Sequence, residues 1–155
     1  MSFAGGDADK TYVTSGSGRF VGTEFLRLRP AGTVLLVLGP DNQINGNCEV
    51  TVALVNYGVV DPALPGAKLI LHCWPKVGPG IWAVTGGLSG QESTLVINTA
   101  VAGSGNLVVD PHGGLDVNVH FSLYGTAAIA PGATIEVAKE VMFDVGKFRP
   151  LDCPQ

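Results

Sequence analysis

Hydrophobic and polar residues alternate along much of this chain with a period of two, which is the pattern of β-strands that bury one face. The alternation is clearest at residues 115–124, where apolar and polar positions follow one another without a break, and it recurs at residues 48–54. No apolar stripe with helical spacing continues for three turns. The pattern therefore predicts an all-β chain.

Glycine and proline clusters separate these runs. Pro30-Ala31-Gly32 is a turn signal, and Asn45-Gly46 is the strongest hairpin signal in the sequence. About eight or nine strands at intervals of about a dozen residues predict a single antiparallel β-sandwich or barrel, and a sandwich of this size is typically of the jelly-roll type. The last segment is either a final strand or an extended tail. The predicted strands are residues 20–29, 33–38, 48–54, 67–73, 81–85, 93–99, 106–109, 115–124 and 134–145.

The two ends of the chain differ from its middle. Residues 1–18 are rich in Gly, Ser, Thr and Asp and offer little to bury, so we expect an N-terminal arm that becomes ordered only against another surface. Residues 19–145 form the predicted jelly-roll β-sandwich, and residues 146–155 a C-terminal tail. A length of 155 residues is enough for one domain with its own core.

The composition favours a protein whose surface is covered by neighbours. The chain is 46% hydrophobic and only 14% charged, against roughly 25% charged in an average soluble domain. A monomer normally keeps a mixed, charged surface for solubility. We therefore expect an oligomer with copies of itself, with sister proteins, or with both.

The charge argues against a nucleic-acid binder that neutralises phosphates, because the net charge is −4 and the nine basic residues are not clustered. The nearest approach to a basic patch is Arg27 and Arg29, which share one face of a strand. A solvated strand face is the preferred interpretation of this pair. A role facing RNA is the alternative.

No catalytic constellation can be identified. None of the three histidines, His72, His112 and His120, lies in a nucleophile motif. Residues 87–91 depart from the Gly-x-Ser-x-Gly elbow at its last position, and Ser89 is therefore interpreted as a loop residue. We predict that the chain is not an enzyme and has no catalytic residue.

Metal and cofactor sites are not predicted either. The three cysteines, Cys48, Cys73 and Cys153, fit neither a disulfide framework nor a Cys-x-x-Cys metal pattern, which favours a reducing compartment. His72 cannot easily share one ion with Cys73, because neighbouring residues of a strand point to opposite faces. The glycine-rich stretches at residues 16–18 and 102–106 lack the lysine and the helix of a phosphate-binding loop.

The sequence also gives no membrane signal. Its N-terminus lacks the layout of a signal peptide, and its longest apolar runs, such as Val34–Leu38, are far too short to cross a bilayer. We expect a protein of a cytoplasm or of something assembled there. Trp74, Trp82 and Tyr124 suit a sugar-stacking platform, although burial in the core or in a subunit interface is the preferred interpretation.

Two features resemble viral coat proteins. The segment Leu115–Thr126, LDVNVHFSLYGT, resembles the closing strand of coat proteins of picorna-like and other positive-strand RNA viruses, which ends near an aromatic-Gly step. Gln155 resembles the residue that picornavirus-like cysteine proteases leave when they cut a polyprotein. Together with the missing basic arm, these features resemble the plant picorna-like viruses of the secovirus family, and the short chain resembles a cheravirus-like coat of three separate jelly-roll proteins.

The resemblance implies a structural virion protein. Such a coat subunit assembles with copies of itself or with sister coat proteins into an icosahedral shell in the host cytoplasm. The shell encloses genomic RNA, which this chain contacts only weakly, and Gln155 is the polyprotein-cleavage residue. Two alternatives stay open, namely a phage-head decoration (cement) protein and a carbohydrate-binding β-sandwich module.

Overall fold

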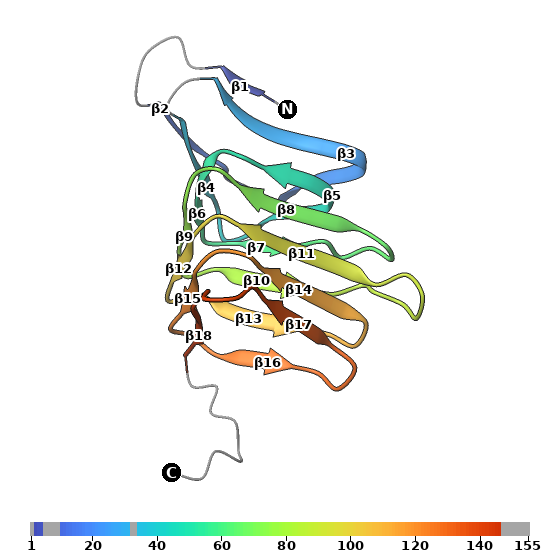
Figure 1. Cartoon of the computed structure of the whole chain (residues 1–155). Coiled ribbons are helices and arrows are strands. Elements are labelled where there is room, and N and C mark those ends of the chain that lie inside the picture. The colour runs from blue at the N-terminus through green and yellow to red at the C-terminus, as the bar shows by residue number, and fades with distance from the viewer. Residues whose placement is uncertain (1, 5–9, 32–33, 147–155) are drawn as a thin grey trace.

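The computed structural model describes residues 2–4, 10–31 and 34–146, and every regular element in this part of the chain is a β-strand. All ladders between these strands are parallel. The chain winds through six turns, each stacked on the one before, so the fold is a parallel β-solenoid (Figure 1). No helix in the described part is long and apolar enough to cross a bilayer.

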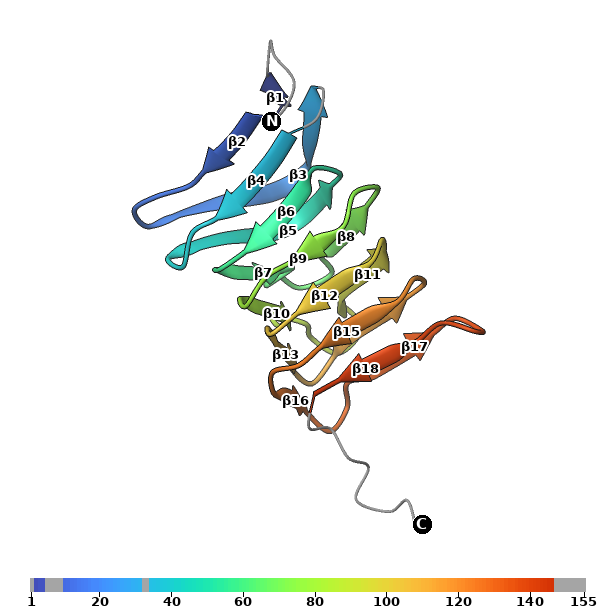
Figure 2. The same ribbon diagram turned by 90° about the vertical axis from the view of Figure 1, so that its left-hand side faces the viewer.

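One side of the solenoid is a seven-stranded sheet, and each of its strands comes from a different winding of the chain (Figure 2). It consists of β2 (Lys10–Val13), β4 (Val34–Leu38), β6 (Ala53–Asn56), β9 (Lys76–Val77), β12 (Val101–Gly103), β15 (Phe121–Leu123) and β18 (Phe143–Val145).

The other sides belong to an eleven-stranded sheet that divides into two branches at β5. Its N-terminal strands are β1 (Ser2–Ala4), β3 (Gly18–Ala31) and β5 (Asn42–Val50). The first branch consists of β7 (Val59–Asp61), β10 (Ile81–Val84), β13 (Asn106–Val109) and β16 (Ala127–Ile129). The second branch consists of β8 (Lys68–His72), β11 (Ser93–Asn98), β14 (Gly113–Val117) and β17 (Thr134–Val137).

Inward-facing side chains form the core in columns, because stacked strands are in register. Along the seven-stranded sheet, Leu54 pairs with Lys76, which pairs with Val101, and the column continues through Phe121 to Phe143. The rings of the last two residues stack with centroids 5.6 Å apart. Most columns are aliphatic and fully buried. Burying such side chains contributes about 1.5–3 kcal/mol each.

A glycine at one corner of nearly every turn lets the windings approach closely. A Cβ atom on Gly80 would lie 2.6 Å from the carbonyl oxygen of Gly58, and one on Gly105 would lie 2.5 Å from that of Gly80. Any other residue would therefore push successive turns apart. The corner glycines that follow the strands of the seven-stranded sheet are Gly39, Gly58, Gly80, Gly105, Gly125 and Gly146.

The predicted antiparallel jelly-roll sandwich is wrong, and the chain is neither a jelly roll nor a β-sandwich. Alternation indicates which side of a strand faces the core, but it does not indicate which strand lies alongside or in which direction. In a parallel solenoid each strand pairs with one about 20 residues away. Across the seven-stranded sheet one turn takes 18 to 25 residues, as the pairs Leu35 with Ala53 and Lys76 with Val101 show.

Several predicted strand boundaries are wrong for the same reason. The predicted hairpin at Asn45-Gly46 lies inside β5, which bends there between its two branches. The predicted strand 115–124 is two strands, β14 and β15, which belong to different sheets. Residues 134–145 contain β17 and β18. Within the predicted arm, β2 pairs with β4, and β1 pairs with β3.

Candidate functional site

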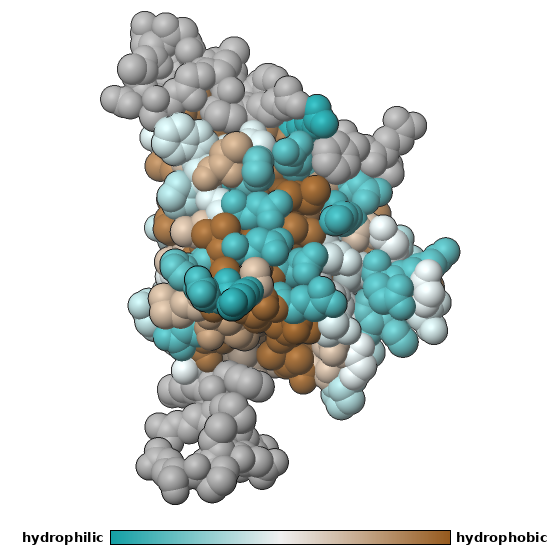
Figure 3. All heavy atoms as spheres, viewed as in Figure 1, coloured by the Kyte–Doolittle hydropathy of each residue, from teal (hydrophilic) through white to brown (hydrophobic). Residues whose placement is uncertain are grey.

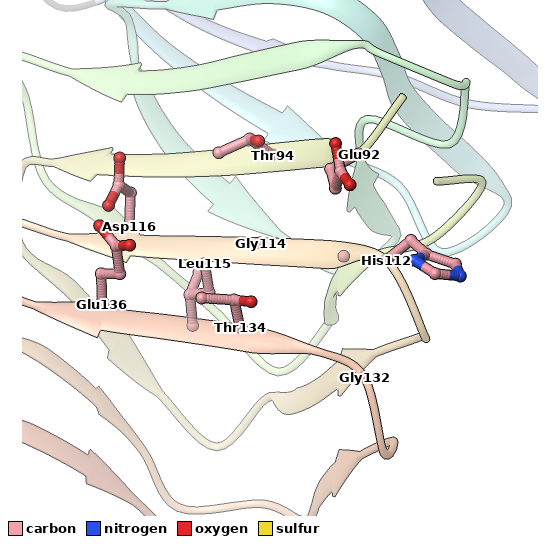
Figure 4. A pocket seen from close by; sticks show the side chains of 10 residues that line it. Glu92, Thr94, His112, Gly114, Leu115, Asp116, Gly132, Thr134 and Glu136 are labelled. Carbon is pink, nitrogen blue, oxygen red and sulfur yellow. The ribbon is translucent and has the colours of Figure 1, made fainter. Parts of the chain in front are cut away.

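A groove lies on the outer face of the second branch. It crosses β11, β14 and β17 and has a volume of about 290 Å³ (Figure 4). Hydrophilic residues are spread over this side of the molecule between patches of apolar ones (Figure 3). The lining residues are Glu92, Thr94, His112, Gly113, Gly114, Leu115, Asp116, Gly132, Thr134 and Glu136.

The strand register builds this groove from alternate residues. Leu115 is buried in the core between Leu95 and Ile135, so the residues on either side of it in β14 point outward. Gly114 is aligned with Thr94 on one side and Thr134 on the other. The missing side chain in the middle of this row leaves the hollow between the two threonines.

One end of the groove is acidic. Asp116 and Glu136 are register neighbours on β14 and β17, and adjacent strands lie about 4.8 Å apart. Both point outward, where water screens the repulsion between two like charges. This end therefore offers carboxylate oxygens as hydrogen-bond acceptors or as partners for a cation.

The other end holds Glu92 and His112. The backbone amide of Glu92 itself, that of Gly90, which donates at 3.2 Å, and the nearby imidazole of His112 lower the pKa of the Glu92 carboxyl. The amide of His112 donates to the carbonyl of Gly132 at 3.3 Å, which fixes the backbone at this end. Glu92 is therefore a carboxylate at neutral pH.

The groove has the chemistry of a binding site. Its side chains offer carboxylates, hydroxyls and one imidazole, and among these lining residues no hydrogen bond joins a nucleophile to a base. No group of three or more His, Cys, Asp or Glu side chains in the described ranges could hold a metal ion. The sequence signal for this site is a spacing of 20, which relates Thr94 to Gly114 and Thr134, and Asp116 to Glu136.

The residues singled out in the sequence do not come together in this groove. Arg27 forms an ion pair with Glu49, with Nε to Oε2 at 3.2 Å. Arg29 belongs to β3, but its side chain lies outside the described part, as does Gln155. His72 is exposed on β8, and Nδ1 of His120 accepts the amide proton of Met142 at 2.9 Å, so only His112 lines the groove.

The cysteines and Ser89 also lie apart. Cys48 is buried, and burial raises the pKa of its thiol to about 12. Cys73 is exposed, neither of these two forms a disulfide, and Cys153 lies outside the described residues. Ser89 is exposed in the turn that the hydrogen bonds between Leu88 and Gln91 close.

The aromatic residues do not form a platform for a sugar. Trp82 is fully buried in the core, whereas Trp74 is 50% exposed and Tyr124 is 71% exposed. Trp74 follows β8 and Tyr124 follows β15, so the two exposed rings belong to different corners of the solenoid.

A second surface feature is the outer side of the seven-stranded sheet, which faces the viewer in Figure 2. Four of its outward residues form one register column, and the only charged residue in β4, β6, β9 and β12, Lys76, points inward and is fully buried. We call this surface the apolar face. Its residues are Leu35, Val37, Ala53, Val55, Val77 and Ala102.

Comparison with known proteins supplies no relative that would assign a role to either surface. No family model matches the sequence, and neither a curated protein nor a solved structure matches it. The groove and the apolar face are therefore interpreted from their own geometry.

Proposed function

We propose that this chain is a structural, non-catalytic subunit that works by assembling with copies of itself. The observation that supports this proposal is the apolar face. It is a flat sheet surface without an outward charge from β4 to β12, in a chain of which only 14% is charged. Contiguous apolar surfaces on soluble proteins are typically interaction sites.

The solenoid suits such a role because it is a stiff body with distinct sides. Its core columns and ladders fix the outer residues at regular strand spacings. The apolar face lies on one sheet and the polar groove on the other. Neighbours can thus cover one side while the other stays in water.

A coat or decoration subunit of a virus particle is the specific role that we retain within this class. A chain of low charge suits a particle in which many copies cover one another. The jelly-roll shell is not retained, because solenoids, and not sandwiches, would have to tile the surface of such a particle.

The proposal predicts association that depends on protein concentration. Sedimentation velocity of the purified full chain from about 1 to 500 µM should show species larger than the monomer at the upper end, and negative-stain microscopy should show their shape. A monomer at every concentration, with no particles on the grid, would contradict the proposed function.

Binding of a polyhydroxylated ligand in the groove is a second candidate function. The specific observation is Gly114, because an added Cβ would make only ordinary contacts there, the nearest at 3.6 Å to Thr94 Oγ1. The fold therefore does not demand glycine at this position, whereas an open groove does. Thr94 and Thr134 place hydroxyls beside it, and Asp116 and Glu136 add acceptors.

A glycan array tests this candidate. We expect binding that is lost in Gly114→Val, which fills the groove, and kept in Ala128→Val, an exposed position of β16. An array without any bound glycan, or equal binding by both variants, would remove this function.

A further inference from the structure

We infer that the apolar face is where a second copy of this chain docks, sheet against sheet, about a two-fold axis. This inference rests on the proposed function and deepens it by naming the surface and the partner. It starts from the column formed by Val37, Val55, Val77 and Ala102, whose members are register neighbours on four successive strands.

The shape of the apolar face suits a flat partner. Strands about 4.8 Å apart place this column along roughly 14 Å, with Leu35 and Ala53 beside it. Branched and small side chains cover the surface without a protruding aromatic ring. Two such faces pack at about 10 Å, as stacked sheets do in protein cores.

The charge distribution favours a copy of the chain over a charged partner. Two apolar faces bring no like charges together, because no outward residue of β4, β6, β9 or β12 is charged. The second branch carries outward charges on Lys68, Asp116 and Glu136, which would be costly to bury against themselves. The self-association surface is therefore the seven-stranded sheet.

The separation of like charges also selects the relative orientation of the two docked copies. Asp144 on β18 is exposed at one end of the column, and Val13 on β2 is 67% exposed at the other end. An arrangement that places β18 over β2 of the partner keeps the two copies of Asp144 apart, by up to about 29 Å across six strand spacings. Val13 of each copy then lies opposite Asp144 of the other at the rim of the contact, so the apolar burial comes from the strands between them. Val77 then lies at the two-fold axis.

The size of the face sets the strength of the contact. The whole outer side of the seven-stranded sheet, of which the apolar face is the middle part, spans about 29 Å. A strand length of four residues adds about 13 Å, so the flat area is at most roughly 400 Å² per copy. A standard interface buries about 800 Å² per partner. We therefore expect a dimer that dissociates in the micromolar range rather than an obligate one.

Sedimentation velocity on three variants of the full chain tests the surface. Val55→Lys and Val77→Lys place a charge in the middle of the apolar face and should weaken dimerisation at least tenfold. Val108→Lys is the matched control, because Val108 is a half-buried outward valine of β13, in the other sheet, and it should dimerise like the unmodified chain. Circular dichroism confirms that each variant keeps its β structure.

The outcomes separate the inference from the proposed function. An unmodified chain that stays monomeric overturns both. Association that persists in folded Val55→Lys and Val77→Lys, or that Val108→Lys abolishes equally, overturns the inference and leaves the proposed function standing. Loss of association in the two face variants alone supports it.

Cysteine cross-linking tests the direction in a background where Cys73 and Cys153 are replaced by Ser. Val77→Cys, at the axis, should be joined into a covalent dimer by a short thiol-specific bifunctional cross-linker, because sheets about 10 Å apart are too far apart for a direct disulfide. Val37→Cys should not be cross-linked by the same reagent. Efficient cross-linking of Val37→Cys would show that the copies run in the same direction and would overturn the proposed arrangement.

Discussion

Lys76 is the fully buried charged residue of the described core. Its Nζ donates to the carbonyl oxygens of His72 at 2.9 Å and of Trp74 at 2.5 Å, and it takes a place in the column between Leu54 and Val101. Burial lowers its pKa from 10.5 to about 7, although the neighbouring Cys73 acts in the opposite direction. The hydrogen bonds of the Lys76 ammonium therefore stabilise the corner after β8, whereas the burial of its charge destabilises the folded state.

The pH dependence of unfolding, compared between the unmodified chain and Lys76→Met, tests how much the burial of this charge costs. Below about pH 7 the folded and unfolded states both hold the proton, and between pH 7 and 10.5 the unfolded state holds more. Stability of the unmodified chain should thus rise with pH in this window, by up to about 1.4 kcal/mol per pH unit from this group. Urea unfolding from pH 6 to 9.5 should show that Lys76→Met lacks this rise.

The exposed Lys68 supplies the control for this experiment. Lys68→Met should follow the pH profile of the unmodified chain, because the side chain of Lys68 is exposed on β8 and takes no part in the buried corner around Lys76. Parallel profiles for the unmodified chain and Lys76→Met would show that the buried amine does not control stability. Cys48 does not disturb the comparison, because it is present in every variant.

At the scale of elements, the corner glycines decide how closely the turns stack. Gly80 sits between Gly58 and Gly105, and an added Cβ would lie 2.6 Å from the backbone oxygen of Gly58. Backbone cannot move aside as a flexible side chain can. The stacking distance of the solenoid therefore depends on the absence of a side chain at this corner.

We expect Gly80→Ala to destabilise the fold by about 1–3 kcal/mol, the usual cost of overpacking. Gly114→Ala should change stability by less than about 0.5 kcal/mol, as outward substitutions usually do, because its Cβ has ordinary contacts only. Urea unfolding at one pH measures both. Equal losses in the two variants would mean that close stacking at the corner is not what requires glycine.

These elements also show how far sequence reasoning extends. Alternation in segment 115–124 is right for Leu115, Val117, Phe121 and Leu123, which are buried, but Val119 is only half-buried between the two strands. The break itself was not predicted, because a solenoid corner can continue the alternation into the next sheet. Glycines recur about once per solenoid turn from Gly39 to Gly146, and this recurrence was the sequence signal for the corners. Individually these glycines look like ordinary turns.

The groove illustrates the same limit. Alternation alone places Asp116 on the outward side of a strand, and its pairing with Glu136 depends on knowing that residues 20 apart lie side by side. His112 was considered as a catalytic candidate, whereas it lines one end of the groove next to Glu92. Arg27 was treated as a surface residue, and its partner Glu49 is likewise a register neighbour. The alternation of apolar and polar residues does not show which strands pair or in which direction.

At the scale of the whole molecule, the solenoid separates its surfaces by sheet. The groove belongs to the second branch of the eleven-stranded sheet, and the apolar face to the seven-stranded sheet. The low charge of the chain is thus unevenly distributed, with the charges of β14 and β17 on one side and none on the outer side of β4 to β12. The proposed assembly and the proposed ligand binding can therefore be tested separately by mutation.

The in-register pairing of Val101 with Phe121 bears on how a chain of this fold can gain or lose windings in evolution. Each winding touches mainly the windings before and after it, so its stability is close to a sum of local and nearest-neighbour contributions. Loss or duplication of a segment that runs from one residue to its register partner would rejoin the ladders without moving an inward side chain outward. Genes for proteins of this kind can therefore change length in steps of one winding, and each step shifts the spacing between the two ends by about 4.8 Å.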